Sequence, residues 1–167
     1  MRHYKRPLTI GRANLDYRLD NHHSLNLNYL LSRIGNDRYD EADTDFEASN
    51  DILAKHVTGF SYNQSLLEEK MSNTFFVKNY INHLNIRQTD LSSITGSKNV
   101  KGTITKKYWG YGIGSRYTAI EPLSIKISYE HSVRLPLARE LFGNGTTIYA
   151  NVALKPESSD NINLGIF

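Results

Sequence analysis

The sequence predicts an all-β protein built from antiparallel, up-and-down strands. Apolar and polar side chains alternate along most of the chain, which is typical of strands because successive side chains point to opposite faces of a sheet. Short clusters of turn-forming residues separate the alternating stretches. Several stretches run for about a dozen residues, against ~5–6 in most globular sheets. Together these features indicate one sheet of long strands.

The N-terminal part of the chain predicts a hairpin. Alternation is strict over residues 11–19 and resumes over residues 24–32. Residues 20–23 between them are rich in turn formers, and so short a connection pairs its two strands antiparallel.

Two further strands flank a turn at residues 67–70. The first covers residues 56–63 and alternates well. The second covers residues 72–87 and has the weakest pattern of the chain, which a bulge between Lys78 and Asn82 would repair by shifting its phase. One helical turn is an alternative for residues 67–70, but a tight turn is favoured because alternation resumes immediately afterwards.

The clearest pattern belongs to the strands that flank the Ile120-Glu121-Pro122 reversal. Proline cannot donate to a strand ladder, which places it at the turn. The strand after the turn has one apolar face and one charged or hydroxylated face. Its apolar face consists of Leu123, Ile125, Ile127, Tyr129, His131 and Val133. A last strand is expected over residues 160–167.

The connections alternate in length along the chain. Short turns near residues 21, 69 and 121 contrast with polar segments of roughly 17 to 24 residues, expected to be long loops at residues 35–55, 88–106 and 134–157. Short turns at one end and long loops at the other are typical of outer-membrane barrels. The sequence therefore predicts part of a transmembrane outer-membrane β-barrel, with about seven strands present and the barrel incomplete.

Composition narrows the functional classes. Hydrophobic residues make up 39% of the chain and the mean hydropathy is −0.50, and no run approaches the ~20 apolar residues of a spanning helix. The net charge of +3 is scattered, so we expect no nucleic-acid partner. No arrangement of a nucleophile with a general base stands out in the sequence. Gly110, Gly112 and Gly114 do not form a phosphate-binding loop, because their spacing is wrong for one. We expect neither an enzyme nor a bound cofactor.

An acidic segment raises the question of a cation site. Asp43, Asp45 and Glu47 begin like a calcium loop, but Ala48 stands where such loops need a turn glycine. A solvated acidic loop is the favoured interpretation, with a cation site as the alternative. The six histidines lack ligand spacing, so no other metal site is expected.

Two motifs near the C-terminus carry a family resemblance. An R-x-P-x-x-x-E-L-F-G segment is followed by an N-x-x-L-K-P-E-x-S-x-N segment that leads into a strand. This pair resembles TonB-dependent receptors of the outer membrane, most closely those of Bacteroidetes-type bacteria. The matching residues are Arg134, Pro136, Glu140, Leu141, Phe142, Gly143, Asn151, Leu154, Lys155, Pro156, Glu157, Ser159 and Asn161. Val152 and Ala153 depart from the pattern, where relatives usually carry a proline and an acidic residue.

The resemblance implies that residues 1–167 are a piece of the barrel domain, with neither the plug domain nor a signal peptide. It further implies an outer-membrane location, contact with lipid and an energy-coupling partner, TonB, that acts through other parts of the protein. An extracellular nutrient would be the ligand, either an iron chelate, a cobalamin-like cofactor or a glycan. The motif residues are expected to shape a loop, and the apolar Leu141-Phe142 pair to dip into the barrel.

Periodicity alone leaves an alternative, because it does not say which face lies inside. A soluble antiparallel barrel or sandwich, acting as a ligand-binding or adhesin domain, would bury Leu123, Ile125, Ile127 and Tyr129 in a dry core. A receptor barrel would turn them to lipid. On the opposite face, Glu130 and Arg134 are expected either as ordinary lumen lining or as part of a charged network. The alternating glycines are expected to let something pack closely, such as the plug.

Overall fold

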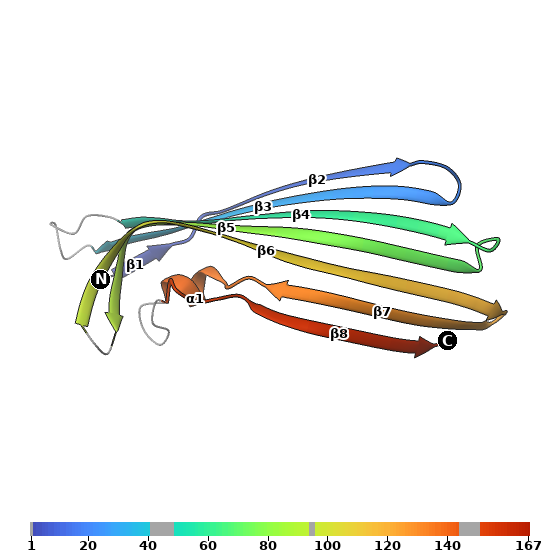
Figure 1. The fold of residues 1–167 in the computed structure, drawn as a ribbon. Helices are drawn as coiled ribbons and strands as arrows, with labels where there is room; N and C mark the ends of the chain where they lie inside the picture. The colour runs from blue at the N-terminus through green and yellow to red at the C-terminus, as the bar shows by residue number, and fades with distance from the viewer. Residues whose placement is uncertain (1, 41–48, 94–95, 144–150) are drawn as a thin grey trace.

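The computed structural model describes residues 2–40, 49–93, 96–143 and 151–167 as a single antiparallel sheet with one short helix (Figure 1). Strands that follow one another in sequence are neighbours in the sheet, so the all-β, up-and-down prediction is confirmed. No helix among these residues has the length and apolar character needed to cross a bilayer. The elements are β1 (Arg2–Lys5), β2 (Leu8–Arg18), β3 (His23–Asp40), β4 (Ser49–Leu66), β5 (Met71–Ser93), β6 (Gly96–Ile120), β7 (Leu123–Arg134), α1 (Ala138–Phe142) and β8 (Glu157–Ile166).

β1 and β2 together occupy one strand position in the sheet. Both pair with β3 in a single unbroken register, from Arg2 opposite Asp40 to Arg18 opposite Ser24. The ladder is interrupted at Pro7, which has no N–H to donate, although its carbonyl accepts a hydrogen bond from the Gly35 N–H at 2.9 Å. Counted in this way, the sheet has the seven strands that the sequence predicts.

Tight turns join the strands at one end of the sheet (Figure 1). Leu67, Glu68 and Glu69 have φ values of 53°, 57° and 70°, which is left-handed and rules out the alternative of a right-handed helical turn. In the first turn, the Asp20 carboxylate accepts the His22 N–H at 2.7 Å. That bond lowers the pKa of Asp20. The predicted turns are therefore confirmed.

Two of the long loops predicted from the sequence, at residues 35–55 and 88–106, consist largely of strand. β3 and β4 remain paired out to Arg38 opposite Ser49, and β5 and β6 out to Ser93 opposite Gly96. Backbone pairing satisfies the N–H and C=O groups whatever the side chains are. Where both faces of a strand are polar and meet water, the strand can continue without the apolar alternation that would reveal it. The polar sequence of these segments therefore gives no sign that the strands extend through them.

The predicted bulge between Lys78 and Asn82 is also wrong. β5 holds one register against both neighbours from Met71 to Asn85, and the irregularity lies between Ile86 and Thr89. The pattern looked out of phase because apolar side chains occur on both faces of β5. One face of β5 contributes Phe75 and Val77 to an exposed apolar band, and the other contributes Leu84 and Ile86 to a buried core.

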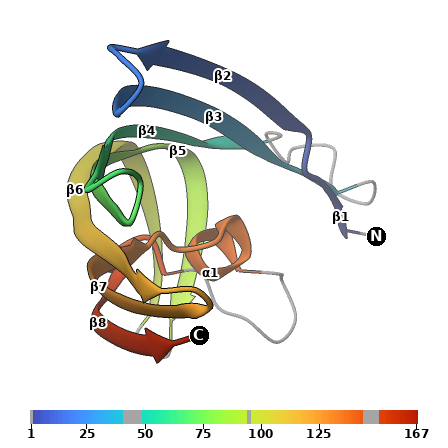
Figure 2. The same cartoon turned by 90° about the vertical axis from the view of Figure 1, so that its right-hand side faces the viewer.

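The two faces of the sheet differ in character. One face is a continuous band of exposed apolar and aromatic side chains, in which Ile127 is 54% and Leu164 72% exposed. The other is the concave face, against which α1 lies (Figure 2). Leu123, Ile125 and Ile127 lie on the exposed band. The dry core expected from a soluble barrel is therefore wrong for these residues.

The buried core lies between the concave face and the segment that carries α1. Among the described residues it consists of Leu53, Leu84, Ile86, Ala138, Leu141, Phe142 and Val152, with Ile34, Ile104 and Leu154 packed against it. Burying apolar side chains here stabilises the loop rather than the sheet, which is held by its ladder. The core therefore fixes one loop against the inner wall.

Candidate functional site

An ionic clasp closes the loop between β7 and β8. Arg134 at the end of β7 donates two hydrogen bonds to the Glu157 carboxylate, at 3.0 and 3.1 Å. The same guanidinium reaches Glu140 of α1 at 3.3 Å. A planar guanidinium is suited to this bidentate geometry, which a lysine cannot reproduce. Three charged residues of the two motifs therefore meet at one point.

Glu140 also holds the start of α1. Its second carboxylate oxygen accepts the Leu137 N–H at 2.8 Å, which satisfies one of the backbone donors left free at a helix start. The Leu137 hydrogen bond first, and then Arg134, hold the pKa of Glu140 below its ordinary value of 4.5. The ionised form of Glu140 is therefore the one that the loop conformation favours.

This lowered pKa predicts an acid-sensitive loop. A group whose pKa is depressed by folding stabilises the folded form above its unfolded value and loses that contribution as the pH falls. We expect the α1 amides to exchange faster with deuterium as the pH drops below about 4.5, after correction for intrinsic exchange. Glu140→Gln should weaken this pH dependence and leave only the part due to Glu157, whose pKa the hydrogen bond from Arg134 also lowers. An unchanged pH profile in that variant would contradict the role of Glu140.

The rest of the first motif is buried. Leu141 and Phe142 are 1% and 2% exposed, so the segment does turn inward as its apolar pair suggested. Gly143 has a φ of 69°, a left-handed conformation that favours glycine. Its carbonyl accepts a hydrogen bond from Arg6 at 2.6 Å, and Arg6 also donates to the Asn36 side chain at 3.0 Å. The loop is thereby tied to the first strands across the concave face.

Residues of the second motif continue the docked loop into β8. The Asn151 N–H donates to the Leu141 carbonyl at 3.0 Å, which links the two motifs. Leu154 packs on the core, while Lys155 is exposed and Pro156 half-buried. In β8, the Ser159 hydroxyl lies 2.8 Å from that of Ser132. The Asn161 amide donates to both hydroxyls, at 3.2 and 3.3 Å.

Pro136 is buried, and its carbonyl accepts a hydrogen bond from the Lys55 ammonium of β4. This contact joins the loop to a third region of the sheet. Lys55, Arg6 and Asn36 were not singled out from the sequence. They lie far from the motifs along the chain, and only the fold brings them together.

Further along the concave face, the alternating glycines make room for aromatic rings. Gly110 and Gly112 of β6 lie opposite Lys78 and Phe76 of β5. A Cβ at Gly112 would come within 2.5 Å of the Phe76 ring, and one at Gly110 within 3.2 Å of the Tyr80 ring. The close packing expected at these glycines is therefore made by rings of the neighbouring strand.

Gly112 and Gly114 differ in the space available for a Cβ atom, so substitutions at the two positions give a prediction and its control. Gly112→Ala should destabilise the sheet by about 1–3 kcal/mol, because its methyl group overlaps both Phe76 and the Tyr129 carbonyl. Gly114→Ala should be tolerated, since its methyl group would meet only the Ser128 Cβ at an ordinary 3.8 Å. Urea titration of the folded protein measures both. Equal losses in the two variants would contradict the packing.

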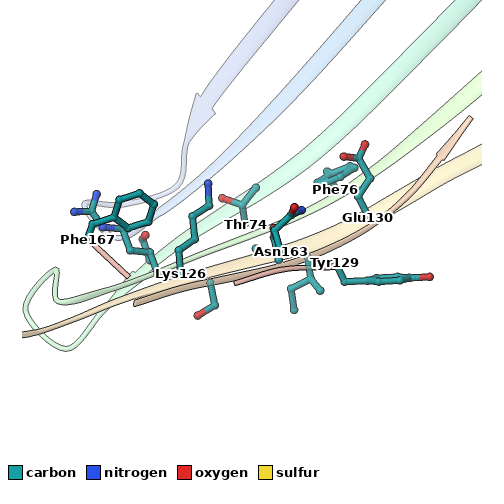
Figure 3. Close-up of a pocket in the computed structure, with 13 residues that line it drawn as sticks. Thr74, Phe76, Lys126, Tyr129, Glu130, Asn163 and Phe167 are labelled. Carbon is teal, nitrogen blue, oxygen red and sulfur yellow. The ribbon is translucent and has the colours of Figure 1, made fainter. Parts of the chain in front are cut away.

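A hollow of about 640 Å³ lies on the concave face between β5 and β8. Thr74, Phe76, Lys126, Glu130 and Asn163 project from one side of the sheet, whereas Tyr129 lies on the other (Figure 3). The wall of this hollow is rich in hydroxyl, amide and charged side chains, as a water-filled lumen requires.

The charge pairing on this face differs from the alternative in which Glu130 and Arg134 belong to one charged network. Glu130 pairs with Lys78 at 3.2 Å, and the Lys78 ammonium lies 4.7 Å from the centre of the Phe76 ring. Arg134, the partner of Glu130 in that alternative, is engaged in the clasp instead. Glu130 therefore pairs with a residue two strands away, across the side-chain-free Gly110 and Gly112 of β6. A residue four positions along its own strand lies about 13 Å away in extended chain.

The exposed band carries its own polar cluster near the loop end. His131 stacks on Tyr111 with ring centres 5.2 Å apart. Its Nδ1 lies 2.8 Å from the Asp160 carboxylate, which also accepts the Tyr129 hydroxyl at 2.8 Å. Aromatic rings with polar partners are typical of the level where a membrane meets water.

Asp43, Asp45 and Glu47, for which the sequence favours a solvated acidic loop over a cation site, lie outside the described residues. Within the part of the chain that the structure describes, no group of three or more His, Asp or Glu side chains gathers as a metal site would. The acidic-loop hypothesis therefore stays a prediction.

A family comparison now adds to these observations. The model of the family described as TonB dependent receptor-like, beta-barrel matches residues 83–166, half of the chain. The chain belongs to this TonB-dependent receptor barrel family. The matched region contains β6 to β8, α1 and the entire clasp. Nothing in the comparison specifies a Bacteroidetes-type relative.

A comparison with solved structures agrees on the fold. The chain is similar to a protein described as the copper transporter OprC, with a TM-score of 0.75 and 15% sequence identity. The match covers 99% of this chain and 27% of that transporter. At this identity the likeness shows the fold alone. No curated protein matches the sequence.

Proposed function

We propose that this chain forms part of the barrel wall of an outer-membrane receptor that binds a scarce nutrient and imports it with energy from TonB. Residues 1–167 would be a partial barrel domain in that protein. Its partners would be membrane lipid, the extracellular nutrient and TonB, the last through parts of the protein outside this chain. Such a receptor is a transport protein and not an enzyme.

The observation that carries the proposal is the distribution of polarity over the sheet. The exposed band of β7 and β8 is apolar, and the concave face beside it is lined by Ser, Asn, Lys and Glu side chains. β2, β7 and β8 have 11, 12 and 10 residues, close to the ~9–11 that a tilted strand needs to cross a bilayer. Family membership supports the same orientation.

The nutrient is a further part of the proposal. An iron chelate, a cobalamin-like cofactor or a glycan each fits an importer of scarce molecules. The likeness to a copper transporter adds copper as a candidate to test, although the identity of 15% supports the fold and not the cargo.

Membrane fractionation tests the location and the closed barrel. An antibody against residues 37–51 should detect the intact protein in the outer membrane, with a mass several times 19.1 kDa and a gel mobility that changes on heating. A soluble 19.1 kDa protein without a heat shift would contradict the proposal. Uptake of labelled iron chelate, cobalamin, glycan and copper, in cells with and without the protein and with and without TonB, then tests import and identifies the nutrient.

A further inference from the structure

The hollow on the concave face contains two cations placed side by side. Arg116 of β6 and Lys126 of β7 are direct partners across the two strands, and both line the hollow. Like charges placed directly opposite one another on neighbouring strands destabilise a sheet. A pair of this kind is expected to have an anion nearby.

The described part of the sheet does not supply that anion. The carboxylate that lines the hollow, Glu130, lies 3.2 Å from the Lys78 ammonium. Across the described residues, none of the recorded ion pairs involves Arg116 or Lys126. Within the described ranges, the hydrogen bond recorded for the Arg116 guanidinium is a long one, 3.4 Å, to the Ser124 hydroxyl.

The surroundings of the pair are suited to binding. On one side of Arg116 lies Ser72 of β5, and on the far side of Lys126 lies Gly165 of β8, beside which the Phe167 ring also lines the hollow. Thr74 and Asn163 project from the sheet on the same side as Lys126 (Figure 3). They add neutral hydrogen-bonding groups to the two charges.

We propose that Arg116 and Lys126 form a carboxylate-binding subsite in the barrel lumen. The guanidinium would bind the two oxygens of the carboxylate, and the ammonium would neutralise its charge. The carboxylate would come either from the imported nutrient or from an acidic side chain elsewhere in the same polypeptide. This inference rests on the proposed function, because it requires the concave face to be the lumen.

The experiment uses the intact receptor in detergent and three variants, Arg116→Gln, Lys126→Gln and Lys106→Gln. Lys106 also lies on the concave side of β6, opposite the buried Asn82, but it does not line the hollow, so its variant is the matched control. Citrate titration by calorimetry probes the first source. Carbodiimide coupling, which joins an amine to a carboxylate in contact with it, probes the second when the products are mapped by mass spectrometry.

A nutrient carboxylate predicts that citrate binds and that each hollow variant weakens it about tenfold, while Lys106→Gln does not. An internal carboxylate predicts a coupled product between Lys126 and an Asp or Glu of the same protein, with a lower yield in Arg116→Gln. The proposal is overturned if the hollow variants bind citrate as the control does and no Arg116-dependent coupling occurs. A heat-modifiable outer-membrane barrel in that case would leave the proposed function standing.

Discussion

Placing a lysine at Ile127 should prevent stable insertion of the barrel. Ile127 is 54% exposed at the middle of the apolar band of β7, and a cationic side chain facing lipid near the bilayer centre costs about 2–4 kcal/mol. That loss is a large part of the 5–15 kcal/mol by which folded proteins are usually stable. Urea titration in lipid vesicles, followed by heat-dependent gel mobility, measures the change.

Ser128→Lys is the control, because Ser128 is the next residue of the same strand and lines the hollow on the concave face. A lysine there meets water, so it should leave the urea midpoint nearly unchanged. If the two variants lost equal stability, or if Ser128→Lys were the more damaging, the assignment of faces would be wrong.

Removing the Phe142 ring should release the loop between β7 and β8 while leaving the sheet in place. Phe142 is 2% exposed in the only apolar core cluster recorded among the described residues, and truncating a buried phenylalanine to alanine costs about 3–5 kcal/mol. The lost free energy is that of loop docking, because the hydrogen-bonded ladder between β7 and β8 does not depend on the Phe142 ring. Phe142→Ala should therefore be cut by protease within residues 135–156 and still show its heat shift.

Leu137→Ala is the matched control in the same segment. Leu137 is 41% exposed, so its truncation leaves no comparable cavity and should add no cleavage. Protease resistance of Phe142→Ala equal to that of Leu137→Ala would show that the ring does not hold the loop. Loss of the heat shift in Phe142→Ala would show instead that the loop supports the whole barrel.

The strand segments whose side chains form the apolar band could be predicted almost residue by residue. In β7, Ile125 and Ile127 face one environment and Lys126 and Ser128 the other, so the side-chain period of two is unambiguous. The tight turns were equally clear, because their short polar segments interrupt that period. The fold class, the strand order and most strand positions follow from these signals.

The extensions of β3 to β6 could not be predicted, because alternation reports a difference between two faces. Past Gly35 in β3 and Ile86 in β5 the side chains are mostly polar, yet the ladders continue. The apparent bulge had a related origin. Phe76 and Tyr80 are apolar rings on the polar face, and their place over Gly112 and Gly110 is visible only when two strands are paired.

The residues that hold the β7–β8 loop were also only partly predictable from the sequence. Arg134, Glu140 and Glu157 were singled out as motif residues, although nothing in their spacing showed that they contact one another. Arg6 and Asn36 had no local signal, since their role depends on the Gly143 carbonyl 137 residues from Arg6. Contacts between distant parts of the chain require the fold to be known first.

That bond from Arg6 to Gly143 has a consequence for the order of assembly. It joins positions separated by 137 residues, and contacts with so long a chain between them form late because closing the intervening chain costs entropy. The bond between Arg6 and Gly143 would therefore form after the loop has packed against Leu53, Leu84 and Ile86 of β4 and β5, which lie nearer to it in sequence. The first strands would then secure a loop that is already docked.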